Sequence, residues 1–162
     1  MRSSILCFMI TKNTNTMSNR MNMQEVLPKS FDALLNLSKY AHSTGIQPTH
    51  HHLILIRASQ INNCAFCLDM HTRDARKAGE TEQRIYTLSA WRETDFFTSE
   101  ECAVLALTEE VTRITNHVSD ETYDNAVKVL GEEYTAGVIM ATIAINGWNR
   151  YAISTMQMPA RD

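Results

Sequence analysis

The segment Gln60–Gly79, QINNCAFCLDMHTRDARKAG, contains a cysteine pair and a histidine at helical spacing. Cys67 is three residues after Cys64, and His71 is four residues after Cys67. Residues that are three, four and seven positions apart lie on the same face of an α-helix. The pattern therefore predicts two thiols and an imidazole along one side of a helix. A redox-active thiol pair with an adjacent base would need this arrangement.

The expected distance between the two cysteines fits a disulfide. Three residues of α-helix rise about 4.5 Å, which separates the two Cα atoms by roughly 5 Å. Disulfides need Cα separations of about 4.4–6.8 Å. Asn62 and Asn63 are suitable N-cap residues, so we expect both cysteines in the first helical turn. At that position the helix dipole stabilises a thiolate by about 0.3–2 kcal/mol.

The rest of the chain has the pattern of an all-α domain. Helix-forming residues dominate, glycine and proline are rare, and strand-like alternation is nearly absent. Apolar periodicity, capping residues and terminal glycines predict about six helices. They are expected near residues 23–45, 48–61, 62–79, 98–116, 119–130 and 132–155, with a short one at 81–91. The last segment is broadly apolar, so we expect it at the centre of the domain or in a subunit interface.

Length, charge and cysteine content exclude several function classes. A chain of 162 residues suits one domain, and its net charge of −3 without a basic block argues against a nucleic-acid partner. No segment has the roughly 20 apolar residues that span a bilayer, so no membrane partner is expected. Four cysteines without a secretory framework favour a cytoplasmic location. Residues 1–22 are expected to form a disordered tail, and residues 23–158 the folded domain.

The motif and its flanks resemble a known family. The segments RASQINNCAFCLDMHTRDARKAGET (57–81), LSAWRE (88–93) and AINGWNRYAI (144–153) resemble the carboxymuconolactone decarboxylase-like superfamily. The resemblance is closest to its alkyl hydroperoxidase D-like branch of thiol peroxidases and covers about residues 23–156. A CxxCxxxH core after an SQxN lead-in is far more specific than a bare CxxC.

The resemblance implies an antioxidant peroxidase with an all-α fold, assembled as a homo-oligomer, often a trimer or hexamer. It implies that Cys67 attacks a hydroperoxide and becomes a sulfenic acid, which Cys64 resolves as a disulfide. His71 would belong to the proton relay that activates Cys67. A dithiol electron donor, in some relatives a lipoyl-bearing protein, would then reduce the disulfide. No cofactor or metal is implied.

One position departs from the family pattern. Relatives commonly have a glutamate twelve residues before the first motif cysteine, and here 64 − 12 = 52 is His52. An imidazole can accept a proton but supplies no negative charge, so it favours an imidazolium at His71 less than a carboxylate would. We expect His52 to be either a relay partner or a structural residue. Activation of Cys67 should then be weaker, or depend steeply on pH near about 6–7.

Two other functions fit the same residues. A structural zinc site could use Cys64, Cys67, His71 and one histidine of residues 50–52, which is a legitimate tetrahedral set. A redox sensor could oxidise the pair once without turnover, a reading that the missing glutamate makes plausible.

Other polar residues near the motif have simpler expected roles. His50 and His51 are expected to be exposed in the first turns of their helix. Asp69 and Asp74 are expected to face solvent, although Asp74 could pair with a nearby lysine or arginine. Arg57 is expected to make buried hydrogen bonds.

Overall fold

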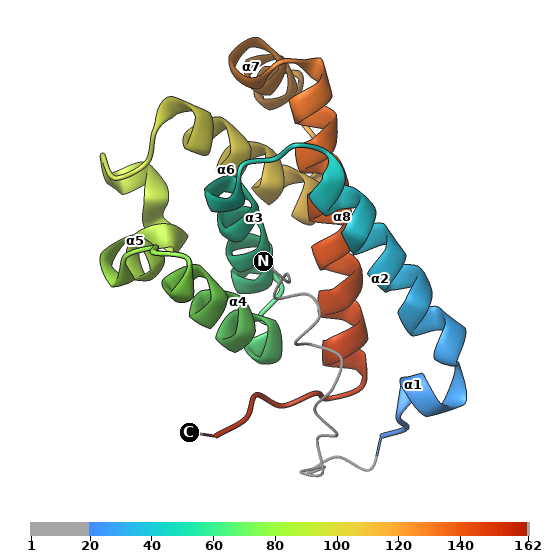
Figure 1. Cartoon of the computed structure of the whole chain (residues 1–162). Helices are drawn as coiled ribbons and strands as arrows, with labels where there is room; N and C mark the ends of the chain where they lie inside the picture. Colours follow the sequence, from blue (N-terminus) through green and yellow to red (C-terminus); the bar gives the residue numbers. More distant parts are fainter. Residues whose placement is uncertain (1–19, 162) are drawn as a thin grey trace.

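The computed structural model describes residues 20–161 (Figure 1). This part of the chain contains α-helices and 3-10 helices but no strand, which confirms the all-α prediction. The elements are α1 (Met23–Val26), α2 (Pro28–Ser43), α3 (Pro48–Ile61), α4 (Ala65–Lys77), α5 (Glu82–Thr87), η2 (Leu88–Glu93), α6 (Ser99–Thr112), η3 (Ile114–Asn116), α7 (Asp120–Leu130) and α8 (Glu132–Ser154). The predicted N-terminal tail lies outside the described residues, apart from residues 20–22.

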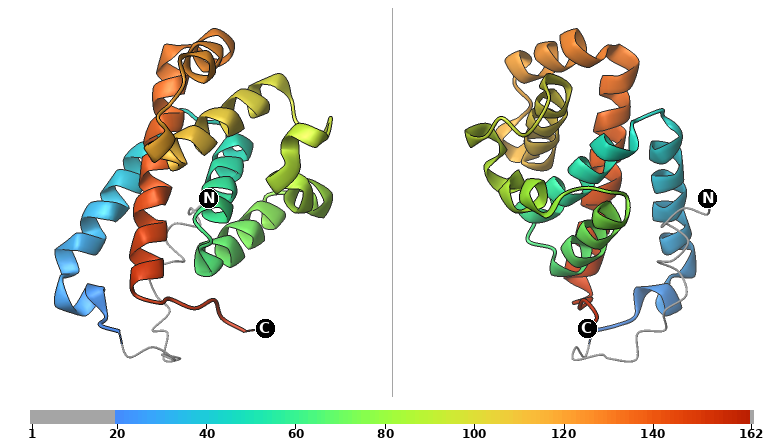
Figure 2. Two further views of the ribbon diagram at one scale, coloured as in Figure 1. Left: turned by 180° about the vertical axis from the view of Figure 1, so that it is seen from behind. Right: turned by 60° about the vertical axis from the view of Figure 1, so that its left-hand side comes forward.

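The longest helix, α8, is the centre of the domain. It has 23 residues, and its buried side chains recur from Thr135 to Ala152. Helix α2 packs along one side of α8, whereas α3, α4 and α6 lie on the other side, as Figures 1 and 2 show. Helix α7 packs near the start of α8. The apolar C-terminal segment is therefore a core helix, as expected. No helix within residues 20–161 is both long enough and apolar enough to cross a membrane.

Residues 20–161 contain eight α-helices rather than about six, and Pro28 accounts for part of the difference. The residue before a proline is sterically disfavoured in the helical region. Leu27 accordingly has φ −134° and ψ 70°, which separates α1 from α2. The segment expected to be one helix over 98–116 also divides. There, α6 ends at Thr112, and Arg113 adopts φ −91° and ψ 45° before η3.

The capping predictions hold where the sequence signal is local. Thr98 and Glu101 form a reciprocal capping box at the start of α6. Thr81 and Ser119 cap α5 and α7 through their side chains. Gly79, which follows α4, has φ +101°, a conformation that side chains rarely adopt. These local signals fix how α4 ends and how α6 begins.

Glu109 on α6 organises a buried ion-pair network. Its carboxylate accepts hydrogen bonds from Arg57 Nε at 2.7 Å, Trp91 Nε1 at 3.0 Å and Arg92 Nη1 at 2.6 Å. The predicted role of Arg57 in buried hydrogen bonding is confirmed. The network therefore joins α3, η2 and α6.

A second polar network fixes the connection between α3 and α4 to the central helix. Asn62 Nδ2 donates to Oδ1 of both Asn146 and Asn149, each at 2.9 Å. Asn149 is fully buried, and its Nδ2 donates to Ser59 Oγ at 3.0 Å. Buried amides are costly unless paired, so this cluster holds the chain firmly just before the cysteine pair.

Candidate active site

Helix α4 begins directly after the first cysteine of the motif. Cys64 is the N-cap residue, and its Sγ accepts a hydrogen bond from the Cys67 backbone N–H at 3.4 Å. The expectation that Asn62 or Asn63 caps this helix is wrong. Asn62 instead ends α3 and binds the asparagines of α8, and Asn63 has φ +56°. Cys64 therefore precedes the helix, while Cys67 is its third residue, near the positive end of the dipole.

The two cysteines form a disulfide. Their Cα atoms are 5.4 Å apart, close to the roughly 5 Å expected from helical spacing. Both side chains are buried, with exposures of 1% for Cys64 and 2% for Cys67. Only Cys67 contributes to the wall of the adjacent cavity. A small molecule in that cavity would therefore meet Cys67 rather than Cys64.

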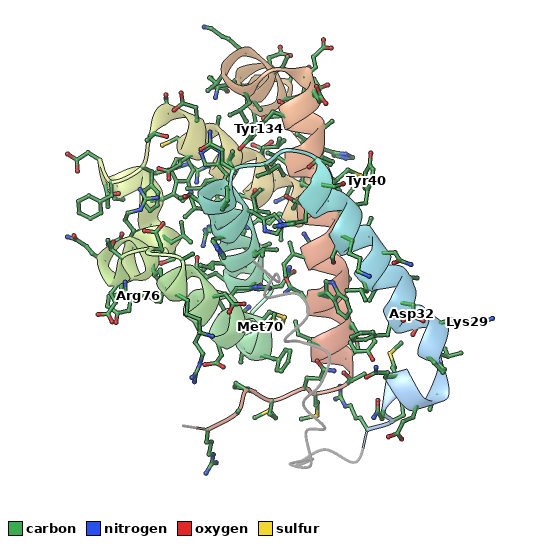
Figure 3. All side chains as sticks on the ribbon, in the orientation of Figure 1. Lys29, Asp32, Tyr40, Met70, Arg76 and Tyr134 are labelled. Atoms are coloured by element: carbon green, nitrogen blue, oxygen red, sulfur yellow. A yellow bond between two sulfur atoms is a disulfide. The ribbon has the colours of Figure 1, made fainter. Side chains whose placement is uncertain are left out.

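The cavity has a volume of about 420 Å³ and lies between α2, α3, α4 and α8. Its wall is mostly apolar, and it includes Met70 of α4, which Figure 3 labels. The apolar lining is formed by Leu35, Ala41, Pro48, Leu55, Phe66, Met70, Ala141, Ala144, Ile145, Trp148 and Ala152. Polar groups in such a lining are few, so each of them matters for binding or chemistry.

Four histidines face this cavity: His42, His51, His52 and His71. The expectation that His51 is exposed is wrong. Its ring packs edge-on against His42, with centroids 5.0 Å apart, because the end of α2 covers the first turns of α3. Burial, with smaller contributions from the nearby His42 and His52, lowers the pKa of His51 to about 4. Burial also lowers the pKa of His71 to about 3, again with two neighbouring imidazoles contributing. Both rings are therefore neutral near pH 7 and can accept a proton.

His50 has a different environment from its neighbours. It is buried rather than exposed as expected, and its Nδ1 lies 2.7 Å from the hydroxyl of Tyr134 on α8. Tyr134, labelled in Figure 3, lies near the start of α8. His50 is absent from the cavity wall, so it has a structural role at the start of α3.

His52 lies in the cavity wall with one unsatisfied nitrogen. Its Nδ1 is buried and has no hydrogen-bond partner. Burial lowers the pKa of this ring, while the charges of Asp74 and Glu80 raise it. Asp74 also lines the cavity, so the expectation that it faces solvent is wrong. The reason is helical spacing, since Asp74 is three residues after His71 on the same face of α4.

The geometry does not favour a structural zinc site. Within residues 20–161, no group of three or more histidine, cysteine or acidic side chains could hold a metal ion. The two sulfurs are bonded to each other, and His71 and His52 lie in the cavity wall.

The sequence predicts four site residues: Cys64, Cys67, His71 and His52. In the structure Cys67, His71 and His52 line one cavity, and Cys64 is bonded to Cys67. The prediction missed His42, which lies on α2 without any local signal in the sequence.

Comparison with known proteins identifies the family. Residues 28–110 match the carboxymuconolactone decarboxylase family. The chain belongs to the carboxymuconolactone decarboxylase family. The chain is similar to the uncharacterized protein YdfG of Bacillus subtilis (strain 168), with 45% identity over 139 residues. That match covers 85% of this chain and 95% of YdfG.

Solved structures with this family's fold include ATU0492 of Agrobacterium tumefaciens, a protein of unknown function whose name links it to the antioxidant defence protein AhpD. It superposes with a TM-score of 0.86 and 34% identity, covering 90% of this chain and 100% of that one. The debrominase Bmp8 superposes with a TM-score of 0.76 over 85% of this chain and 74% of its own. At 17% identity, Bmp8 shows the shared fold alone. The family takes its name from a decarboxylase.

Proposed function

We propose that this protein is a thiol-dependent peroxidase in which Cys67 is the peroxidatic residue and Cys64 resolves it. The observation that carries the proposal is the position of Cys67. Its sulfur lies at the start of α4 in the wall of an apolar cavity, with His71 one helical turn away. A helix N-terminus and a nearby base are the two features that lower the pKa of a thiol. The name of the ATU0492 relative points in the same direction.

The chemistry balances with the residues at hand. The Cys67 thiolate attacks one peroxide oxygen, the O–O bond breaks, and the departing alkoxide takes a proton and leaves as an alcohol. Cys67 is thereby oxidised to a sulfenic acid. The Cys64 thiolate then attacks the Cys67 sulfur, forming the disulfide and releasing hydroxide, which leaves as water. A dithiol donor supplies two electrons and becomes a disulfide itself.

The histidines of the cavity would accept and return the protons of this cycle. His71 would accept the Cys67 proton. Burial lowers the pKa of its ring to about 3, so the imidazolium would need the adjacent Cys67 thiolate and other negative charge in the cavity to stabilise it. His52 would be the second member of the relay. Its unpaired Nδ1 is a buried acceptor or donor that a peroxide oxygen could engage. The donor would be a small dithiol or a lipoyl-bearing protein, and we predict a homo-oligomer in the cytoplasm.

The test is steady-state reduction of an alkyl hydroperoxide with dihydrolipoamide as the electron donor. Cys67→Ser should abolish peroxide consumption and Cys64→Ser should leave a sulfenic acid on Cys67, detected by dimedone labelling and mass spectrometry. A single oxidation event without turnover would identify a redox sensor instead. Loss of the first oxidation in Cys64→Ser would mean that the two cysteines have reversed roles.

A further inference from the structure

Asp74 is the single acidic side chain that lines the cavity in the part of the chain that the structure describes. It continues the stripe of Cys67 and His71 along α4, at successive spacings of four and three residues. Its side chain is only 17% exposed. A carboxylate in so apolar a lining is costly to bury without a counter-charge or hydrogen-bond donor.

The charged neighbours of Asp74 are unevenly distributed. Lys77, one turn further along α4, places its Nζ 3.6 Å from Asp74 Oδ1. That ammonium is 76% exposed, so solvent weakens the pair. On the cavity side, Asp74 faces His52 of α3, whose pKa the carboxylate raises. Asp74 therefore carries negative charge into a cavity whose other titratable groups are imidazoles and a thiol.

The groups around the two relay histidines come from several elements. Asp74 on α4, Glu80 beyond its end, and His42 on α2 all act on His52. His71 faces the imidazoles of α3, which disfavour a second positive charge. With the disulfide closed, the cavity holds no thiolate, and the rings of His51 and His71 remain neutral. Reduction adds the Cys67 thiol, whose proton needs a place where the resulting cation is stabilised.

We infer that Asp74 is a positioning residue for the proton relay: its carboxylate acts on His52 and so stabilises the proton that Cys67 passes to the pair of His71 and His52. The inference rests on the proposed function. It assigns to α4 a negative charge that His52 does not supply from α3. The step moves one proton and no electrons: the S–H bond of Cys67 breaks and an N–H bond forms on an imidazole, while the Asp74 carboxylate makes and breaks no bond. Thiolate, imidazolium and carboxylate then alternate in charge across the cavity.

The test measures thiolate formation directly, without peroxide or electron donor. In a reduced Cys64→Ser background, the rate of Cys67 alkylation by iodoacetamide is followed against pH by peptide mass spectrometry. Asp74→Asn should raise the pH midpoint by about one unit, which lowers the alkylation rate about tenfold below the midpoint. Asp69→Asn is the matched control. It removes a carboxylate of the same helix that pairs with Arg73 and is absent from the cavity wall, so the midpoint should not move.

Two further variants separate a charge effect from a packing effect. His52→Glu, added to Asp74→Asn, restores a carboxylate from the opposite side of the cavity and should return the midpoint towards that of the parent. His52→Gln alone should raise the midpoint, and adding Asp74→Asn to it should have little further effect, because the two residues act through one proton.

An unchanged midpoint in Asp74→Asn overturns the inference, as does an equal shift in Asp69→Asn. Failure of His52→Glu to restore the midpoint also counts against it, since charge would then not be the lost property. These readouts differ from the test of the proposed function. A protein that forms the Cys67 thiolate through Asp74 but consumes no peroxide would support this inference and refute the peroxidase.

Discussion

Acid should destabilise this protein well above the pH at which carboxylates titrate, because neutral histidines are enclosed in the cavity. The pKa is lowered from 6.5 to about 4 for His51 and to about 3 for His71. Below pH 6.5 the unfolded chain binds protons that the folded chain does not, so the free energy of unfolding falls as the pH falls. The stability is complete above about pH 6.5 and is lost progressively down to the folded pKa values.

The expected magnitude follows from the size of the two shifts. Each proton bound only by the unfolded state costs about 1.4 kcal/mol per pH unit. Between pH 6.5 and pH 5, each of the two histidines therefore removes about 2 kcal/mol, and together they remove about 4 kcal/mol. That is a large part of the total stability of a typical domain, about 5–15 kcal/mol.

Urea unfolding of the oxidised protein, followed by circular dichroism at about pH 7.5 and pH 5, measures this loss. His71→Gln should reduce the difference between the two pH values by about 2 kcal/mol, because one titrating ring is gone. His117→Asn removes an exposed imidazole outside the cavity and serves as the control. A wild-type difference below about 1 kcal/mol, or an undiminished difference in His71→Gln, would refute the reasoning.

Three substitutions test the packing and pairing of the helices by urea unfolding. Gly137→Ala would place Cβ 2.9 Å from Oγ1 and 3.3 Å from Cβ of Thr44, so we expect a loss of about 1–3 kcal/mol despite the better helix propensity. The Cβ of Gly147→Ala would meet only a flexible leucine methyl at 3.0 Å. We expect its stability to be unchanged or to rise by up to about 1 kcal/mol. An equal loss of stability in both variants would contradict the steric argument. Glu109→Ala leaves Arg57 buried without its carboxylate, which should cost about 3–5 kcal/mol; a loss below about 1 kcal/mol would show that water replaces the partner.

The sequence predicted those features of the fold that depend on neighbours along the chain. The stripe of Cys67 and His71 on one helical face, the capping box at Thr98 and the glycine after α4 all follow from spacings of a few residues. Such signals hold because a single helix satisfies them without help from the rest of the domain. The central position of α8 was predictable for a similar reason, since its apolar residues surround it on most sides.

The features that the sequence did not predict depend on contacts between distant segments. Asn62 looks like a helix cap, but α8 provides two amide oxygens that recruit its side chain into a buried cluster. The exposure of His51 was misjudged because the end of α2 covers it through His42. Asp74 resembles a surface residue in the sequence, because a single acidic residue in a charged helical segment does not indicate that a cavity lies beside it.

The sulfur cap of α4 has a practical consequence for mutagenesis. Serine is a preferred N-cap residue, and its hydroxyl can accept a hydrogen bond from the same Cys67 backbone N–H that donates to the Cys64 sulfur here. Exchanging Cys64 for serine therefore removes the redox partner while keeping, or improving, the local fold. Phenotypes of that variant can be assigned to lost sulfur chemistry, whereas most active-site substitutions confound chemistry with folding.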